Sequence, residues 1–257
     1  TKEKIAQEKK AVFSFFTGTG TETVTETAFV PAASEFAPFL ARGVKGKVNF
    51  YARESAGLEN VRDCGIFGWE FAIDGARAAF PLPGAHNLEN AAAAIVLARA
   101  LGIRGASIAA GLSAVKTLAG RGEIVAAEMG GHRVTVINDC YNANPDSMEK
   151  ALAFFDRTVW TGGRKIVVAG EMLELGSSGA EEHKKLFARL NGLRAEKKYF
   201  FHVSDTVFSG GFPGGEIAVY NDRERLKAVL DGDAQEGDLV LLKGSRTCAL
   251  EQILDKR

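Results

Sequence analysis

Residues 165–176 read KIVVAGEMLELG. The first five form a nearly continuous apolar run, which predicts a strand of the kind that parallel sheets bury on both faces. Gly170 then opens a loop that carries two glutamates and ends at Gly176. In open α/β sheets, ligands bind beyond the carboxyl ends of the strands. This stretch therefore predicts both a buried parallel sheet and a polar loop at its ligand-binding edge.

The same alternation of strand and helix extends to both sides of this stretch. Further strands are predicted at 124–127, 134–137, 198–203, 217–220 and 238–242. Helices are predicted at 145–157, 180–193, 222–231 and 246–255. A βα repeat of this kind predicts an α/β fold with a Rossmann-like, doubly wound parallel sheet. We place the domain boundary near residue 138, which gives domains 1–138 and 139–257.

The N-terminal part has a more mixed pattern. Residues 2–16 predict an amphipathic helix with Ile5, Val12 and Phe16 on one stripe, ended by a turn at 18–20. Short strands are predicted at 29–30, 48–51, 66–67 and 71–73, and the last of these leads into a turn at 74–75. Helices are predicted at 34–41, 87–101 and 106–115. The last two resemble a helical hairpin on a larger α/β domain.

Composition narrows the classes of protein to consider. The 257 residues are 46% hydrophobic and 25% charged, which is normal for one large or two modest globular domains. Lys+Arg and Asp+Glu both number 32, so the charge balance gives no sign of nucleic acid as a partner. The longest apolar runs fall short of the 18 residues that a membrane span needs, so we expect no membrane insertion. The mixed charges at 181–185 predict a solvated helix face.

The cysteines and histidines give no sign of a disulfide framework or a metal site. The three cysteines are far apart and odd in number, which favours a reducing compartment. The four histidines form no metal-ligand spacing with them. The sequence begins with Thr1, carries no visible signal peptide and opens directly on a helix. We therefore expect a cytoplasmic protein whose N-terminus lies further upstream.

Polar loops follow two more of the predicted strands. Residues 138–147 read NDCYNANPDS, and residues 243–247 read KGSRT. Each loop precedes a predicted helix, whose first backbone N–H groups can bind an anion. Lys243 and Arg246 add positive charge suited to a carboxylate. The alternative is that Asn144 and Asp146 are helix caps, the glycines form turns and Arg246 is a surface residue.

Other glycine-rich segments lack the context of a nucleotide loop. The sequence contains no GxxxxGK[ST] phosphate loop. Residues 18–21 follow a helix instead of a strand, and residues 209–215 lead into a strand, so the latter are predicted to form a surface loop. The absence of a strand-led GxGxxG also argues against a dinucleotide oxidoreductase.

Five motifs resemble those of the Mur ligase family, in the same order along the chain. They are PGAHNLENAAAA at 83–94, Gly120-Arg121, NDCYNANPDSM at 138–148, GEMLELG at 170–176 and LLKGSR at 241–246. The third and fifth are most similar to the member that adds D-alanyl-D-alanine. The resemblance covers residues 2 to 255 and implies the C-terminal part of a P-loop-type ATPase domain followed by the Rossmann-like domain.

The resemblance implies an ATP-dependent amide ligase of peptidoglycan synthesis. ATP would phosphorylate the carboxylate of a UDP-N-acetylmuramoyl-tripeptide, and D-alanyl-D-alanine would attack the resulting acyl phosphate. Such chemistry depends on positioning and on charge stabilisation by Mg²⁺ and cationic side chains. The family also implies a cytoplasmic monomer that closes about a hinge, for which Gly120 and Gly122 are candidates.

Site residues follow from the motifs, position by position. The nucleotide-binding candidates are His86, Asn87, Asn90, Arg121, Asp139, Tyr141, Asn142 and Asn144. The candidates for binding the dipeptide are Glu174, Lys243, Ser245 and Arg246. Lys9 matches the family lysine that becomes carbamylated, and a carbamate would give Mg²⁺ an oxygen ligand or an oxygen that contacts the ligands of the ion. The alternative for Lys9 is an exposed helix lysine.

The sequence also departs from the family pattern. It lacks the UDP-sugar-binding domain, the phosphate loop, and the Glu and His that help to bind Mg²⁺; residues 25–27 read TET where an NADD-like turn is expected. We therefore expect this chain alone to bind nucleotide weakly and to be inactive. Two alternatives stay open: a ligase like folylpolyglutamate synthase, and a non-catalytic nucleotide- or peptide-binding module.

Overall fold

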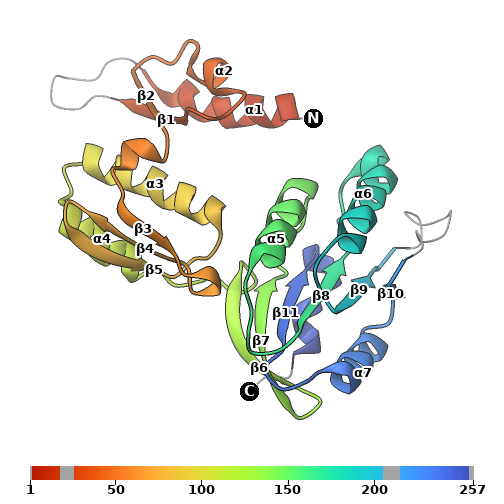
Figure 1. The fold of residues 1–257 in the computed structure, drawn as a ribbon. Coiled ribbons are helices and arrows are strands. Elements are labelled where there is room, and N and C mark those ends of the chain that lie inside the picture. Colours follow the sequence, from red (N-terminus) through yellow and green to blue (C-terminus); the bar gives the residue numbers. More distant parts are fainter. Residues whose placement is uncertain (1, 18–25, 205–214, 255–257) are drawn as a thin grey trace. The chain divides into compact units, whose positions relative to one another are not determined.

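The computed structural model describes residues 2–17, 26–204 and 215–254. The chain divides into two compact units, Thr1–Val115 and Lys116–Arg257 (Figure 1). The turn expected at 18–20 and most of the surface loop expected at 209–215 lie outside the described residues. None of the helices in the described ranges combines the length and apolar character that crossing a membrane requires.

The first unit begins with a helix and a small parallel sheet. Its elements are α1 (Lys2–Ala11), η1 (Val12–Phe15), β1 (Thr27–Pro31), α2 (Ala37–Ala41) and β2 (Lys47–Tyr51). Strands β1 and β2 pair in parallel. The expected apolar stripe is wrong, because Ile5 and Val12 are both 57% exposed and α1 buries Ala6 instead. The helix tightens to a 3₁₀ turn from Val12, which breaks the 3.6-residue period on which the stripe depends.

An antiparallel sheet and two helices complete the first unit. Its elements are η2 (Glu54–Ala56), β3 (Glu59–Asp63), η3 (Gly65–Phe67), β4 (Trp69–Ile73), β5 (Ala76–Phe80), α3 (Ala85–Ala100) and α4 (Gly105–Ser113). The strand expected at 66–67 is wrong, because left-handed Gly65 and Gly68 bend the chain there. The turn at Asp74-Gly75 is confirmed, and both residues have the positive φ of a tight hairpin turn.

The core of this unit lies between the antiparallel sheet and the two helices. Strand β4 contributes Trp69, Phe71 and Ile73, while α3 contributes one apolar stripe. That stripe is formed by Leu88, Ala91, Ala92 and Ile95. Ala91 and Ala92 are buried in this core, so the alanine-rich motif has a packing role.

The second unit is built on a 6-stranded sheet. Its strands are β6 (Glu123–Met129), β7 (His132–Asp139), β8 (Lys165–Gly170), β9 (Lys197–Phe201), β10 (Ile217–Tyr220) and β11 (Leu239–Lys243). Its helices are α5 (Pro145–Arg157), α6 (Gly179–Asn191) and α7 (Arg223–Asp233). The strand order is β10-β9-β8-β11-β7-β6, and every neighbouring pair is parallel except β6 with β7. The doubly wound α/β fold is thus confirmed.

The two units meet in sequence between Val115 and Lys116, earlier than the boundary expected near residue 138. Strand β6 pairs along its whole length with β7, and β7 pairs with the central strand β11. This hairpin therefore belongs to the sheet of the second unit. An antiparallel hairpin interrupts the βα repeat, which is why the repeat alone placed the boundary too late.

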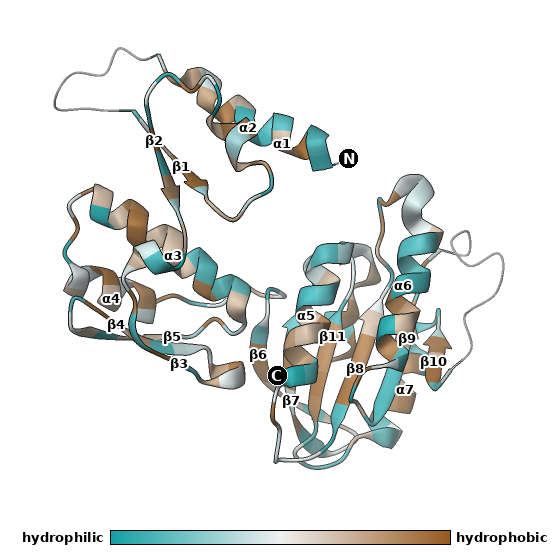
Figure 2. Cartoon of the chain, turned by 45° about the horizontal axis from the view of Figure 1, so that its top comes forward, coloured by the Kyte–Doolittle hydropathy of each residue, from teal (hydrophilic) through white to brown (hydrophobic). Residues whose placement is uncertain are grey.

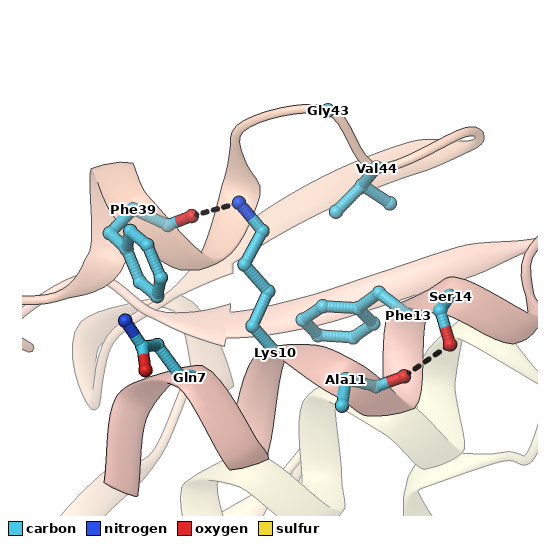
Figure 3. Close-up of a pocket in the computed structure, with 8 residues that line it drawn as sticks. All are labelled: Gln7, Lys10, Ala11, Phe13, Ser14, Phe39, Gly43 and Val44. Carbon is cyan, nitrogen blue, oxygen red and sulfur yellow. Dashed lines mark hydrogen bonds between the residues drawn. The ribbon is translucent and has the colours of Figure 1, made fainter. Parts of the chain in front are cut away.

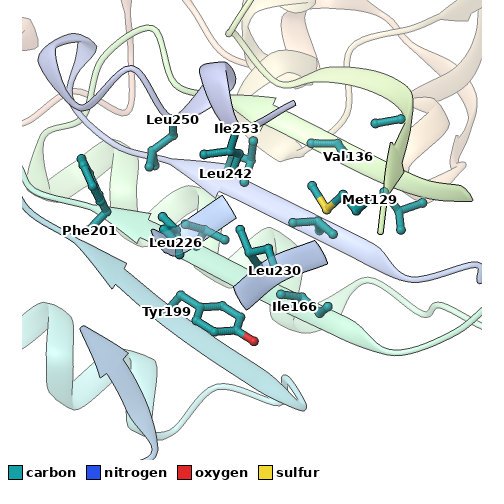
Figure 4. Close-up of a cluster of buried hydrophobic side chains, with 14 of the residues drawn as sticks. Met129, Val136, Ile166, Tyr199, Phe201, Leu226, Leu230, Leu242, Leu250 and Ile253 are labelled. Carbon is teal, nitrogen blue, oxygen red and sulfur yellow. The ribbon is translucent and has the colours of Figure 1, made fainter. Parts of the chain in front are cut away.

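Apolar layers cover both faces of the sheet. On one face, Leu226 and Leu230 of α7 pack with Leu250 and Ile253 against strand residues such as Val136 (Figure 4). On the other face, Phe187 of α6 packs against Phe200 with ring centroids 4.9 Å apart and the ring planes tilted by 55°. Figure 2 shows the strands as hydrophobic and much of the helical surface as hydrophilic. The carboxyl ends of the strands are left free to carry polar loops.

Two expectations for this unit are wrong in part. The helix expected at 246–255 is a pair of 3₁₀ turns, η6 (Arg246–Cys248) and η7 (Leu250–Ile253), because Ala249 between them is left-handed with φ 45°. The solvated face expected at 181–185 holds for Lys184 and Lys185, but His183 is buried.

Candidate active site

Three polar loops meet at the carboxyl edge of the large sheet. Lys243 ends the central strand β11, in register with Asp139 at the end of β7 and Ala169 in β8. The loops that follow these strands therefore begin side by side, as the sequence predicted. This edge is the usual ligand-binding region of an open α/β sheet.

Lys243 is committed to contacts within the chain. Its Nζ lies 2.9 Å from Oδ2 of Asp139 and donates to the carbonyl of Asn142 at 2.8 Å. The Lys243 side chain is only 3% exposed. Its charge was expected to meet the carboxylate of a dipeptide, whereas the structure turns it toward the loop after β7. The register between β7 and β11 is what brings this pair together.

Backbone hydrogen bonds fix the loop after β8. The N–H of Met172 donates to Nε2 of His183 at 3.0 Å, and the N–H of Leu173 donates to Oγ of Ser245 at 2.8 Å. Because Nε2 accepts, Nδ1 of His183 carries the proton and donates to the carbonyl of Gly179 at 2.8 Å. Ser245, expected to bind substrate, thus holds the neighbouring loop in place.

Glu171 is a buried carboxylate that joins the loop after β8 to the end of β9. Its Oε2 accepts from the N–H groups of Val203 at 2.9 Å and Ser204 at 3.0 Å, and its Oε1 accepts from the Ser204 hydroxyl. Sequence reasoning singled out Glu174 in this motif and missed both Glu171 and His183. Glu171 directly follows a fully buried strand, and this position was the available signal that its side chain needs internal partners.

Two glycines allow the loops after β8 and β11 to touch. A Cβ on Gly244 would lie 2.9 Å from the Cα of Gly170, and a Cβ on Gly170 would lie 3.0 Å from the Cα of Gly244. No side chain fits between backbones this close. These glycines are therefore required by the close approach of the two loops.

Arg246 and Glu174 are the exposed charged candidates at this edge. The guanidinium of Arg246 pairs with Glu251, and its side chain is 64% exposed. Glu174 is exposed and adopts a left-handed conformation with φ 63°. A residue with a Cβ pays for that conformation, and such strain gathers at functional sites. Both groups are placed to meet a ligand from solvent.

The loop after β7 is organised around Tyr141. The guanidinium of Arg121 lies 3.9 Å from the centroid of the Tyr141 ring, and the N–H of Tyr141 donates to the carbonyl of Gly120 at 2.9 Å. Both side chains are exposed. The structure thus places Arg121 against Tyr141, which follows Asp139 by two residues in the same loop.

Asn144 and Asn142 shape the backbone of the same loop. Asn144 caps α5: its Oδ1 accepts from the N–H of Ser147 at 2.8 Å, and the Ser147 hydroxyl accepts from the N–H of Asn144. The cap alternative is therefore confirmed for Asn144. Asn142 Oδ1 accepts from the N–H of Ala143 at 2.8 Å. Just before this loop begins to turn, burial raises the pKa of the Cys140 thiol well above its ordinary value.

The candidates of the first unit lie at the N-terminus of α3. Nδ2 of Asn87 donates to the carbonyl of Pro83 at 2.8 Å, and Nδ2 of Asn90 donates to Oδ1 of Asn87 at 3.3 Å. His86 and Asn90 are exposed. Trp69 supports the turn from below, since its Nε1 donates to the carbonyl of Gly84 at 3.1 Å. These contacts hold the side-chain amides of Asn87 and Asn90 in one orientation, which fixes where each amide can donate and accept.

Lys9 and Lys10 line different hollows beside α1. Lys9 is exposed and lines a cavity of about 230 Å³ with Ile5, Phe36 and Leu40 among its walls. Lys10 lines a second hollow of about 340 Å³, where its Nζ donates to the carbonyl of Phe39 at 2.8 Å (Figure 3). Since Lys10 acts as a donor, Lys9 is the better candidate for conversion to a carbamate.

A metal site is not complete within the part of the chain that the structure describes. No group of three or more His, Cys, Asp or Glu side chains is placed there to hold an ion. A carbamate on Lys9 would supply one oxygen ligand, so the described residues do not by themselves fit a Mg²⁺ site.

Comparisons with known proteins agree on one family. Residues 120–246 match the family model described as Mur ligase, glutamate ligase domain. The chain is 34% identical, over 98% of its length, to UDP-N-acetylmuramoyl-tripeptide--D-alanyl-D-alanine ligase of Treponema pallidum, of which it covers 53%. It is 32% identical, over 73% of its length, to the Bacillus subtilis protein of the same name, of which it covers 41%. The chain spans about half the length of the curated relatives that it matches.

Solved structures show the same fold. MurF from Acinetobacter baumannii superposes with a TM-score of 0.76 at 22% identity, covering 98% of this chain and 55% of that one. The MurF ligase of Thermotoga maritima in complex with ADP superposes with a TM-score of 0.67 at 24% identity. That comparison covers 88% of this chain and 52% of the Thermotoga chain.

Proposed function

The chain belongs to the Mur ligase family, and we propose that it is the part of an ATP-dependent ligase that receives D-alanyl-D-alanine. The complete reaction joins this dipeptide to a UDP-N-acetylmuramoyl-tripeptide in peptidoglycan synthesis. The meeting of three polar loops at one sheet edge supports this proposal, because these loops carry Asp139, Glu174 and Arg246, and Arg121 contacts Tyr141 of the first loop. The substrates are those in the names of the two relatives described above.

The dipeptide has one carboxylate and one ammonium group, and the edge offers a partner for each. Arg246 would bind the carboxylate, for which a guanidinium fork is suited. Glu174 would face the ammonium group. Ser245 would keep the loop that carries Glu174 at the right distance, since its hydroxyl already holds the N–H of Leu173. Positioning of the amine is the main contribution that such side chains make to its attack on an acyl phosphate.

Each unit carries its own candidates for binding the nucleotide. In the second unit, Arg121 and Tyr141 would stack near the nucleotide while Asp139 faces ribose hydroxyls. In the first unit, Asn87 and Asn90 would bind the base, because an amide both donates and accepts. ATP supplies the phosphoryl group that activates the peptide carboxylate. Mg²⁺ would need ligands beyond those that the described residues offer, with the Lys9 carbamate as one contributor.

We propose that the ligase works as a monomer in the cytoplasm, where ATP is available. The sequence has no phosphate loop and spans about half of its relatives, so we expect the 257 residues alone to be inactive. The decisive experiment supplies the native protein that carries this chain with ATP, Mg²⁺, UDP-N-acetylmuramoyl-tripeptide and D-alanyl-D-alanine. Mass spectrometry should find the pentapeptide product together with released phosphate.

Two controls make this experiment specific. Glutamate offered in place of the dipeptide tests the alternative acceptor chemistry of folylpolyglutamate synthase, and it should give no product. A native protein that binds nucleotide but forms no product with either amine would overturn the ligase assignment and favour a binding module. Size-exclusion chromatography with light scattering checks the proposed monomer.

A further inference from the structure

Lys243 holds a central place at the sheet edge, yet its ammonium group is not free to meet a substrate. It ends the strand that lies between β7 and β8, so it stands between the nucleotide loop, residues 139–144, and the loop after β8. In the described part of the chain, the Lys243 ammonium group contacts the nucleotide loop and not the loop after β8. A cation that is 3% exposed can reach a carboxylate from solvent only by leaving Asp139.

The two contacts of Lys243 span the first turn of the nucleotide loop. One binds the side chain of Asp139, at the end of β7, and the other binds the backbone carbonyl of Asn142. A single ammonium group therefore sets both the direction of the Asp139 carboxylate and the path of the backbone around Tyr141. The Asp139 side chain remains 26% exposed, so one side of it can still meet a ligand.

The rest of the loop is held from other directions. Gly120 binds the N–H of Tyr141, and the capping box of Asn144 with Ser147 fixes the end of the loop at α5. If Lys243 were replaced, the Asp139 carboxylate and the Asn142 carbonyl would lose the cation that joins them, even with these other restraints in place. A partly buried carboxylate that loses its partner cation is destabilised and turns toward water.

We propose that Lys243 is a positioning residue for the nucleotide loop, which aims Asp139 at the nucleotide, and that it does not bind the dipeptide. This inference rests on the proposed ligase function and changes the role first expected for Lys243. On the same loop, Arg246 is the exposed cation and takes the carboxylate-binding role alone. The two cations, three residues apart, thus serve different substrates.

The test separates the two substrates by steady-state kinetics of the native protein that carries this chain. Lys243→Met should raise KM for ATP about tenfold and lower kcat, with KM for D-alanyl-D-alanine changed less than about twofold. Arg246→Gln is the matched control. It should raise KM for D-alanyl-D-alanine and change KM for ATP less than about twofold. Lys243→Arg keeps the positive charge and should recover part of the loss. A rise in KM confined to the dipeptide in Lys243→Met would overturn the proposal.

A second measurement needs no activity. Hydrogen exchange at the amides of residues 141–143 should accelerate in Lys243→Met, while exchange at 171–173 stays as in the native protein. If Lys243→Met folds poorly, Asp139→Asn can be measured in its place. It keeps the side-chain shape and should produce the same exchange pattern. Unchanged exchange at 141–143 in both variants would overturn the positioning role. If exchange accelerates but the native protein joins no dipeptide, the positioning role of Lys243 stands and the ligase function is rejected.

Discussion

The imidazole of His183, on α6, accepts a hydrogen bond from the backbone N–H of Met172 at 3.0 Å, eleven residues earlier in the chain. The same ring donates from Nδ1 to Gly179 and packs edge-on against Phe200 at 6.1 Å. It thereby fixes the loop after β8 to the start of α6. A neutral ring is required, because a protonated Nε2 would face the Met172 N–H donor with another donor.

We expect His183→Leu to lower the free energy of unfolding by about 1–3 kcal/mol, since the buried N–H of Met172 loses its acceptor. His183→Gln should cost less, because the amide oxygen can replace Nε2 as the acceptor. Urea unfolding gives the energies, and hydrogen exchange at the Met172 amide locates the effect. The exposed neighbour Lys184→Leu serves as the control and should leave that amide unchanged. Equal losses for Leu and Gln would show that ring packing, and not the hydrogen bond, carries the effect.

At the opposite end of the strands, Asp238 and Arg164 form a second long-range pair. Asp238 has no exposed surface and accepts from Arg164 Nη2 at 2.7 Å and from the Arg164 N–H at 2.9 Å. We expect Asp238→Asn to lower the free energy of unfolding by about 3 kcal/mol, because an arginine at the sheet is left without its carboxylate. Chemical unfolding at pH 7 measures the loss. Glu236→Gln removes a surface carboxylate that pairs with Arg133 and should shift the unfolding midpoint much less.

The same pair predicts how stability depends on pH. Burial alone would raise the pKa of Asp238, but hydrogen bonds from Arg164 outweigh it, and the pKa lies below its ordinary value. A carboxyl with a lowered folded-state pKa stabilises the fold fully above its unfolded-state pKa of about 3.9, and loses that effect as the pH falls through the folded value. The stability difference between the native protein and Asp238→Asn should therefore shrink below about pH 4. A difference that stays constant down to pH 2 would contradict this assignment.

Local sequence signals were sufficient for most of the second unit. The apolar runs at 165–169 and 238–242 predicted two buried strands, and the capped pattern at Pro145 predicted α5; the structure confirms all three. The error at 246–255 has one local cause, since a left-handed Ala249 interrupts an otherwise helical pattern. Alanine gives no sequence signal for that conformation. The hairpin of β6 and β7 was detected as two strands, but its membership of the larger sheet depends on pairing with β11, about a hundred residues away.

The sequence predicted which loops meet at the sheet edge, but it did not predict the contacts that their residues make. The three loops do meet, because parallel strands bring their carboxyl ends to one edge. The pairing of Lys243 with Asp139 depends on the register of two distant strands, which the sequence does not state. The burial of His183 was accessible in principle: Gly179, His183, Leu186 and Leu190 form one helical stripe on α6. The surrounding charges concealed it.

The three cysteines should differ sharply in reactivity. Burial raises the pKa of Cys248 to about 11 and raises that of Cys140 further, whereas Cys64 is partly exposed in the first unit. Because the thiolate is the reacting species, a thiol reagent at pH 8 should label Cys64 rapidly and the other two only on unfolding. Mass spectrometry of the labelled peptides gives the sites. Rapid native labelling of Cys248 would mean that the loops after β8 and β11 open readily in solution.

Glu174 should show a conflict between stability and binding. Its left-handed backbone costs a residue with a Cβ about 1–2 kcal/mol, and Glu174→Gly removes that cost while adding flexibility to the unfolded chain. We therefore expect Glu174→Gly to leave the free energy of unfolding unchanged or to raise it by up to about 1 kcal/mol. Asn60→Gly, at another exposed position with φ 53°, is the matched control and should gain less, because asparagine tolerates this conformation better.

Binding should respond to the charge of Glu174 and not to its backbone. If the carboxylate faces the ammonium group of the dipeptide, both Glu174→Gln and Glu174→Gly should weaken D-alanyl-D-alanine about tenfold, or roughly 1.4 kcal/mol. Any change in stability should be confined to the glycine variant, since glutamine keeps the strained backbone. Titration of the dipeptide into the native protein and both variants, alongside thermal unfolding of each, separates the two effects. Dipeptide affinity that is unaltered in Glu174→Gln would remove the carboxylate from the binding site and leave its left-handed conformation without a functional cause.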